Sequence, residues 1–173
     1  RQPDRVRALV LGNTFAWPLT GDPHFERFSA VFGGRLGRVA IRRGNAFVNL
    51  LVPAGTRRRR LSRTEMRHYR RPLDTPARRE ASWVLPRELI ASHDFLAEVE
   101  AGLPRLRDRP TLLVWGDADI AFRAGERRRF EQLFPAHTVV ELPGAGHYIQ
   151  EDAPVEIAAA IRDWWDQIGR AHV

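Results

Sequence analysis

The sequence contains no cysteine and no lysine, and it has a single methionine among its 173 residues. Without cysteine, neither a disulfide framework nor a thiolate metal site can form. Cysteine usage therefore does not indicate whether the protein works in an oxidising or a reducing compartment. No apolar run approaches the roughly 20 residues of a transmembrane helix, and no signal-peptide pattern stands at the start. With 43% hydrophobic residues, these absences predict a soluble, cytoplasmic protein with one sizeable core.

Arginine supplies all 28 of the Lys and Arg residues, and the formal net charge is +7. Such a balance is typical of proteins that bind nucleic acid or an acidic membrane. Many of the arginines crowd residues 35–79, among few acids, chiefly Glu65 and Asp74. Since no nucleic-acid motif and no interleaved aromatic residues accompany them, we interpret the segment as a solvated surface. A binding module for nucleic acid or anionic lipid is kept as a remote alternative.

Both ends of the sequence suggest a piece of a longer protein. The chain starts at Arg1 rather than Met, and residues 1–11 already have the pattern of a helix end leading into a strand. Residues 168–173 (IGRAHV) match the translation of a common sequencing adapter. We therefore expect an adapter-derived tail there and exclude it from fold prediction.

Two apolar runs break into polar loops in a way that indicates a functional edge. Residues 111–115 stop at Gly116 and are followed by Asp117 and Asp119, whereas residues 138–142 lead into a glycine-rich loop that presents His147. Buried parallel strands of α/β proteins deliver functional side chains at their carboxyl ends in this manner. Residues 6–11 are a third expected strand.

Between Phe15 and about Arg109 the pattern predicts short helices and no strand, which is typical of a helical insertion between consecutive strands. The expected helices are 23–32 with Asp22 as N-cap, 39–52 with a weak point at Gly44, 62–72 with a Ser62–Glu65 capping box, 75–83 stopped by Pro86, and 94–103. Helices over 124–134 and 155–165 then alternate with the strands. The fold class is α/β, a parallel sheet covered by helices.

Asp119 and His147 are the candidate catalytic residues. A histidine in a glycine-flanked loop after a strand suits a general base, and an aspartate one strand–helix–strand unit earlier would orient its ring. Asp117 competes for the acid role and is interpreted as a loop carboxylate. The candidate pocket-lining residues are Asn13, Phe15, Tyr69 and Trp83, each with packing as the alternative role. No phosphate-binding loop, HExxH helix or calcium loop is present, so neither cofactor nor metal is expected.

Five strings carry a resemblance to a known family. They are PDRVRALVLGNTFAWP (3–18), LVPAGT (51–56), EMRHYR (65–70), TLLVWGDADIAFR (111–123) and VELPGAGHYIQEDAP (140–154). In this order they resemble the second half of a haloalkane dehalogenase, a member of the α/β-hydrolase superfamily. The resemblance implies residues 1–14 as the sixth core strand, 15–109 as a helical cap, and 110–167 as the last two core strands with the acid and histidine.

The resemblance implies hydrolysis of a small halogenated alkane. An aspartate would displace halide to form an alkyl-enzyme ester, which water activated by His147 would cleave. Asp119 matches the acid after the seventh strand. Some members keep a glutamate after the sixth strand instead; here that position is Asn13, an amide that cannot act as the charge partner, so the chain resembles the subgroup with an Asp-His-Asp triad.

The family's nucleophile and halide-binding tryptophan would precede Arg1, so the catalytic triad in this chain is incomplete and we expect the fragment alone to be inactive and poorly folded. An epoxide hydrolase is the close alternative. That family uses two tyrosines of the cap, whereas this chain has only Tyr69 and Tyr148, and Tyr148 adjoins His147 rather than lying in the expected cap. A serine esterase stays open because the nucleophile is unseen. We expect no nucleic-acid or membrane partner, and the oligomeric state stays open.

Overall fold

The computed structural model describes residues 2–170 and divides them into two compact units. The sheet unit comprises the chain up to Phe15, the short segment Gly55–Arg59 and the chain from Ala101 onward. The helical unit comprises Ala16–Ala54 and Arg60–Glu100. Among the helices of residues 2–170, none has both the length and the apolar character that a membrane-spanning helix requires.

Within residues 2–170, three parallel strands form the sheet, in the order β1-β2-β3. They are β1 (Leu9–Gly12), β2 (Thr111–Gly116) and β3 (His137–Leu142). The central strand β2 is buried along its whole length, as its continuous apolar run predicts. Pairing of Gly12 with Val114 and of Gly116 with Leu142 brings the carboxyl ends of the strands to one edge. The predicted parallel α/β arrangement is confirmed; the first strand starts later than expected.

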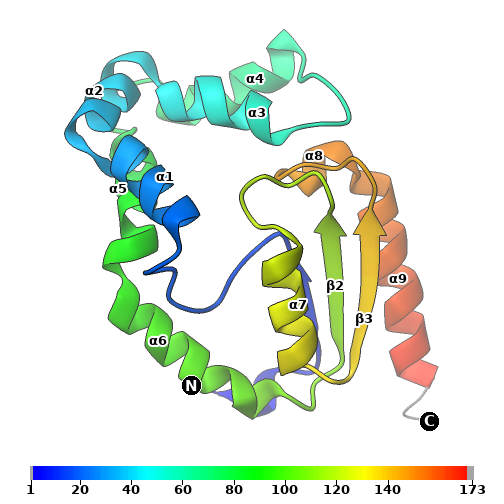
Figure 1. The fold of residues 1–173 in the computed structure, drawn as a ribbon. Helices are drawn as coiled ribbons and strands as arrows, with labels where there is room; N and C mark the ends of the chain where they lie inside the picture. Colours follow the sequence, from blue (N-terminus) through cyan, green and yellow to red (C-terminus); the bar gives the residue numbers. More distant parts are fainter. Residues whose placement is uncertain (1, 171–173) are drawn as a thin grey trace. The chain divides into compact units, whose positions relative to one another are not determined.

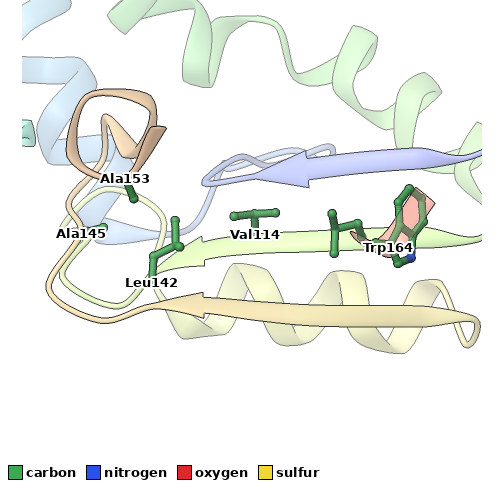
Figure 2. Packing of buried hydrophobic residues seen from close by; sticks show 6 residues of the cluster. Val114, Leu142, Ala145, Ala153 and Trp164 are labelled. Carbon is green, nitrogen blue, oxygen red and sulfur yellow. The ribbon is translucent and has the colours of Figure 1, made fainter. Parts of the chain in front are cut away.

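Helices cover both faces of the sheet (Figure 1). On one face, Leu112 and Val114 pack with Trp164 of α9 (Pro154–Arg170), and Figure 2 shows Val114 and Trp164 in that cluster. On the other face, Trp115 packs against Phe130 of α7 (Ala124–Leu133). Alternate side chains of a strand point to opposite faces, so β2 alone serves both halves of the core.

The end of the chain contains more helix than the sequence pattern indicated. A short helix α8 (Ile149–Asp152) precedes α9 and was not predicted. Helix α9 continues past the expected end to Arg170, and Ile168 packs against the core cluster. The start of the expected adapter tail is therefore helical, and residues 171–173 of that tail lie outside the described part of the chain.

The helical unit has no strand among its described residues. Its elements include α1 (Pro23–Gly33), α2 (Arg35–Gly44), a π-helical turn (Phe47–Leu51), α3 (Val52–Gly55), α4 (Arg63–Arg70), α5 (Glu80–Ala91) and α6 (His93–Gly102). The two predicted N-terminal caps are confirmed, because Asp22 accepts from the backbone N–H of His24 and Ser62 forms a capping box with Glu65. Helices α1, α2 and α5 pack on one another around Phe25 and Ile41.

Two helix predictions in this unit were wrong. The expected helix 39–52 starts four residues earlier, breaks after Gly44 at Asn45, whose φ is 50°, and resumes through Pro53 to Gly55. Residues 75–79 of the expected helix 75–83 form a turn instead, because the guanidinium of Arg79 donates to the carbonyls of Leu73, Asp74 and Arg42 and holds the chain there. Residues 80–83 are helical, as expected.

Helix α5 then begins at Glu80 and runs through Pro86 instead of stopping there. Proline inside a helix costs about 3 kcal/mol, since it removes a hydrogen bond and crowds the preceding turn. Pro86 is fully buried, and α5 packs against α1. Burial against a neighbouring helix thus outweighs the local preference.

Candidate active site

The sheet unit brings the candidate acid and the candidate histidine to the same edge. Asp119 follows β2 and His147 follows β3, and these strands are parallel neighbours whose last residues are paired. The loops from neighbouring carboxyl ends therefore meet. This is the place where open α/β sheets keep their ligand sites.

Nδ1 of His147 lies 3.1 Å from Oδ2 of Asp119. The Asp119 side chain has no exposed surface, whereas 30% of the His147 side chain is exposed. The other carboxylate oxygen of Asp119 accepts the backbone N–H of Ala121 at 2.6 Å, so both oxygens are held. A carboxylate at Nδ1 retains the proton on that nitrogen, which leaves Nε2 as the ring atom able to accept a proton.

Asp117 does not reach the histidine. It is exposed, and its Oδ1 accepts the backbone N–H of Gly144 at 2.5 Å. This bond joins the loop after β2 to the loop after β3. Of the two aspartates in this stretch, the structure thus puts Asp119 beside His147 and Asp117 in a loop contact.

Asn13 joins all three strand ends. Its Nδ2 donates to the carbonyl of Gly146 at 2.9 Å, and its Oδ1 accepts the backbone N–H of Gly116 at 2.9 Å. The residue is buried and has a φ of 38°, a left-handed conformation that asparagine tolerates better than most residues. Both ends of its amide are engaged with backbone, so the geometry gives Asn13 a structural role in aligning the loops that follow β2 and β3.

Aromatic side chains lie against the imidazole. The ring of Phe122 is 5.4 Å from that of His147 and stacks on Phe15 at 5.2 Å. The ring of Tyr148 meets the imidazole edge-on, with the ring centres 5.1 Å apart, and burial raises the pKa of its phenol. Sequence reasoning named Phe15 as a candidate pocket-lining residue, and that role stays a prediction. It did not single out Phe122, although Phe122 follows Asp119 closely in the same loop.

Tyr69 and Trp83 belong to the helical unit. Trp83 donates its indole N–H to the carbonyl of Gly33 at 2.9 Å, and the guanidinium of Arg38 lies 4.5 Å above its ring. These contacts give Trp83 a packing role within its own unit. A pocket-lining role for Tyr69 and Trp83 stays a prediction.

The structure adds one residue that sequence reasoning missed, Asp152. Its carboxylate is buried and accepts the backbone N–H groups of Gly146 at 2.8 Å, Arg57 at 2.8 Å and Arg58 at 3.1 Å. Gly146 directly precedes His147 in the loop between β3 and α8, residues 143–148, which we call the histidine loop. Asp152 thus anchors the histidine loop to the segment Gly55–Arg59. The only sequence feature that could have pointed to Asp152 is its position as an acid shortly after His147.

Glycines allow these loops to approach one another closely. A Cβ on Gly116 would collide with the carbonyl oxygen of Ala145, and a Cβ on Gly146 with that of Gly55. The backbone N–H of Tyr148 also donates to the Gly55 carbonyl at 3.1 Å. The histidine loop is therefore held by backbone packing from two sides.

No group of three or more His, Cys, Asp or Glu side chains among the described residues could hold a metal ion. The cluster that the sheet unit does contain is an aspartate, an imidazole and surrounding aromatic rings. Such a set can orient an imidazole and transfer a proton.

A family model described as alpha/beta hydrolase fold matches residues 1–154. The chain is 44% identical over 160 residues to "Haloalkane dehalogenase 2" of Mycobacterium tuberculosis, covering 91% of this chain and 55% of that protein. It is 27% identical to a "Cis-3-alkyl-4-alkyloxetan-2-one decarboxylase" of Shewanella oneidensis, covering 94% of this chain and 53% of that protein. The chain thus spans about half the length of the curated relatives it matches.

Solved structures of haloalkane dehalogenases also superimpose on this chain. An ancestral haloalkane dehalogenase superimposes with a TM-score of 0.84 at 31% identity, covering 98% of this chain and 63% of that one. The haloalkane dehalogenase DbeA from Bradyrhizobium elkani gives a TM-score of 0.82 at 29% identity, with coverage of 98% and 63%. The resemblance drawn from the five sequence strings is confirmed by these similarities.

Proposed function

Because the chain belongs to the α/β-hydrolase family, we propose that its Asp119–His147 pair serves a hydrolase that cleaves carbon–halogen bonds in small alkanes. The observation that carries the proposal is this pair, located at the carboxyl edge of a sheet that superimposes on haloalkane dehalogenases. The relative with 44% identity bears that name as well.

In the proposed reaction, a carboxylate nucleophile attacks the halogen-bearing carbon, forms an ester bond and releases halide. Nε2 of His147 then takes a proton from water, whose oxygen attacks the ester carbonyl and releases the alcohol. Asp119 stabilises the imidazolium formed in that step. The regenerated carboxylate, the alcohol, the halide and one proton balance the reaction. This assignment corresponds to the Asp-His-Asp arrangement.

We assign the nucleophile and the halide-binding groups to the part of the relatives that this chain does not match, since it covers 55% of the dehalogenase of Mycobacterium tuberculosis. The helical unit, Ala16–Ala54 and Arg60–Glu100, is proposed to act as the cap. The chain alone is then expected to release no bromide from 1,2-dibromoethane. Bromide release by the purified chain would contradict this assignment.

A chimera tests the activity directly. The unmatched part of the Mycobacterium tuberculosis relative is joined to this chain, and halide release from 1,2-dibromoethane is measured. Asp119→Asn should lower turnover by about 10³- to 10⁴-fold, because an amide supports the wrong imidazole tautomer. Asp117→Asn is the matched control and should retain activity, because its oxygen can still accept from Gly144.

His147→Gln separates the two chemical steps. The first step needs no base, so this chimera should release one equivalent of halide and accumulate the alkyl ester, visible as an added alkyl mass on the intact protein. A folded chimera with His147 intact that releases no halide, yet hydrolyses an activated ester, would favour another α/β hydrolase. An epoxide hydrolase would instead convert styrene oxide to the diol.

A further inference from the structure

The arginines crowded into residues 35–79 do not all have the same surroundings. Several arginines of the chain pair with acids in their own unit: Arg42 with Glu80 at 2.9 Å, Arg58 with Glu156 at 2.6 Å and Arg127 with Glu141 at 2.8 Å. Their charges are balanced locally. A second group gathers around a cavity in the helical unit whose lining contains a single acid, Asp74.

This cavity has a volume of about 310 Å³ and is lined by residues from the end of α2, from α4 and from the turn that follows α4. Five arginines contribute to its wall, with one acid: Arg43, Arg67, Arg70, Arg71, Arg79 and Asp74. All of these residues belong to the helical unit. We call this feature the arginine pocket.

The single acid of the arginine pocket is already used. Asp74 forms an ion pair with Arg78 at 3.1 Å, and Arg78 does not line the pocket. The guanidinium of Arg79 donates hydrogen bonds to the backbone carbonyls of Leu73, Asp74 and Arg42. Asp74 is therefore not available to neutralise the remaining lining arginines, and Arg79 keeps its own positive charge although its donors are engaged.

Four guanidinium groups are left, and within residues 2–170 none of them has a carboxylate partner. Arg70 donates Nε to Oδ1 of Asn49 at 2.7 Å, and Arg67 reaches only the hydroxyl of Thr64 at 3.4 Å. Arg43 and Arg71 make no ion pair within the described residues. Like charges held around one cavity repel one another, and a bound anion would relieve that repulsion.

The chemistry of the pocket favours a phosphate group over a simple carboxylate. Guanidinium presents a planar fork of donors that matches phosphate oxygens, and several forks can share the oxygens of one phosphate. The cavity volume lies at the lower end of small-molecule sites, which suits a compact ligand. We propose that the arginine pocket binds the phosphate group of a small ester, carried by a soluble molecule or by a lipid headgroup. This site is independent of the proposed hydrolase activity.

Calorimetric titration of the chain with inorganic phosphate and with glycerol phosphate, at constant ionic strength set by chloride, tests the proposal. Arg67→Gln/Arg71→Gln should weaken binding at least about tenfold, because two charge-assisted contacts are lost. Arg27→Gln/Arg35→Gln is the matched control: it removes the same charge from exposed arginines of the same unit that do not line the pocket, and it should bind as the unchanged chain does.

Circular dichroism of both double variants establishes that they are folded, and Arg43→Gln provides a second, independent test of the same pocket. Vesicles of phosphatidylcholine and phosphatidylglycerol distinguish the source of the phosphate: sedimentation with vesicles that is lost in the pocket variant, and not in the control, identifies a lipid headgroup. Saturable binding of glycerol phosphate without sedimentation identifies a soluble ester. No saturable binding, or equal loss in both double variants, would overturn the proposal and leave a solvated surface. Binding of duplex DNA that both double variants weaken equally would also overturn the proposal.

Discussion

The carboxylate of Asp152 accepts the backbone N–H of Gly146 at 2.8 Å, one residue before His147. The same carboxylate accepts from Arg57 and Arg58, which lie more than 90 residues earlier in the chain. One buried side chain therefore connects the histidine loop to a distant segment of the sheet unit. The position of the imidazole depends on this anchor as well as on Asp119.

Asp152→Asn should weaken the link between the histidine loop and the segment Gly55–Arg59. The amide oxygen can take the place of Oδ2, which accepts from Gly146 and Arg57, but the amide N–H groups then face the backbone N–H of Arg58. Leaving such a buried donor unpaired costs about 1–3 kcal/mol. We expect that loss in the free energy of unfolding, together with faster hydrogen exchange at the amide of Arg58. Gln150→Ala, on the exposed side of the same helix α8, is the control and should change neither quantity. Equal exchange rates in both variants would contradict the anchoring role.

Gly146→Ala should disturb the same loop by a steric route. The added Cβ would meet the carbonyl oxygen of Gly55, which is backbone and cannot turn away. Overpacking of this kind costs about 1–3 kcal/mol in the free energy of unfolding. Gly125→Ala in α7 meets nothing within 4 Å and should be neutral or stabilising by up to about 1 kcal/mol. Urea unfolding measures the free energy of unfolding of the two variants. A destabilised Gly125→Ala together with an unaffected Gly146→Ala would contradict this prediction.

The elements that the sequence predicted well are those whose signal is local. The run Leu112–Trp115 is continuous and ends at a glycine, and β2 is a buried central strand as expected. The Ser62–Glu65 spacing and the Asp22-Pro23 pair also carry their own caps within a few residues. In each case the stabilising contacts lie close together in the chain, so pattern and structure agree.

The features that the sequence did not predict depend on contacts that are distant in sequence. Pro86 is fully buried within a helix that packs against α1, and the two backbone partners of Asn13 are 103 and 133 residues away. Asp152 was overlooked for the same reason, since a carboxylate that binds distant backbone N–H groups leaves no spacing pattern. By contrast, the Asp119–His147 pair could be anticipated because each residue directly follows a recognisable strand.

Replacement of Asn13 should show that its role is to align the loops. Asn13→Ala leaves the N–H of Gly116 and the carbonyl of Gly146 without their buried partner, and we expect a loss of about 2–4 kcal/mol in the free energy of unfolding. Asn13→Asp keeps the acceptor for Gly116 but sets a carboxylate oxygen against the Gly146 carbonyl. The free energy of unfolding of Asn13→Asp should therefore lie below that of the unchanged chain, and the difference should become smaller at acidic pH, where the new carboxyl is protonated and can donate. Denaturant titrations at neutral and acidic pH distinguish this result from a deficit that is independent of pH.

Tyr148 should make the fold sensitive to alkaline pH. Burial raises the pKa of its phenol above the value of 10.0 that the residue has in an unfolded chain. As pH rises past that value, the unfolded chain loses the phenolic proton before the folded chain does, so the free energy of unfolding falls; below it, the contribution is complete. The sequence has no lysine and no cysteine, so its two tyrosines dominate titration in this range. The free energy of unfolding, measured from below to above pH 10, should therefore decline. The decline should be smaller in Tyr148→Phe than in the control variant Tyr69→Phe. An identical decline in Tyr148→Phe and the unchanged chain would assign the sensitivity to another group.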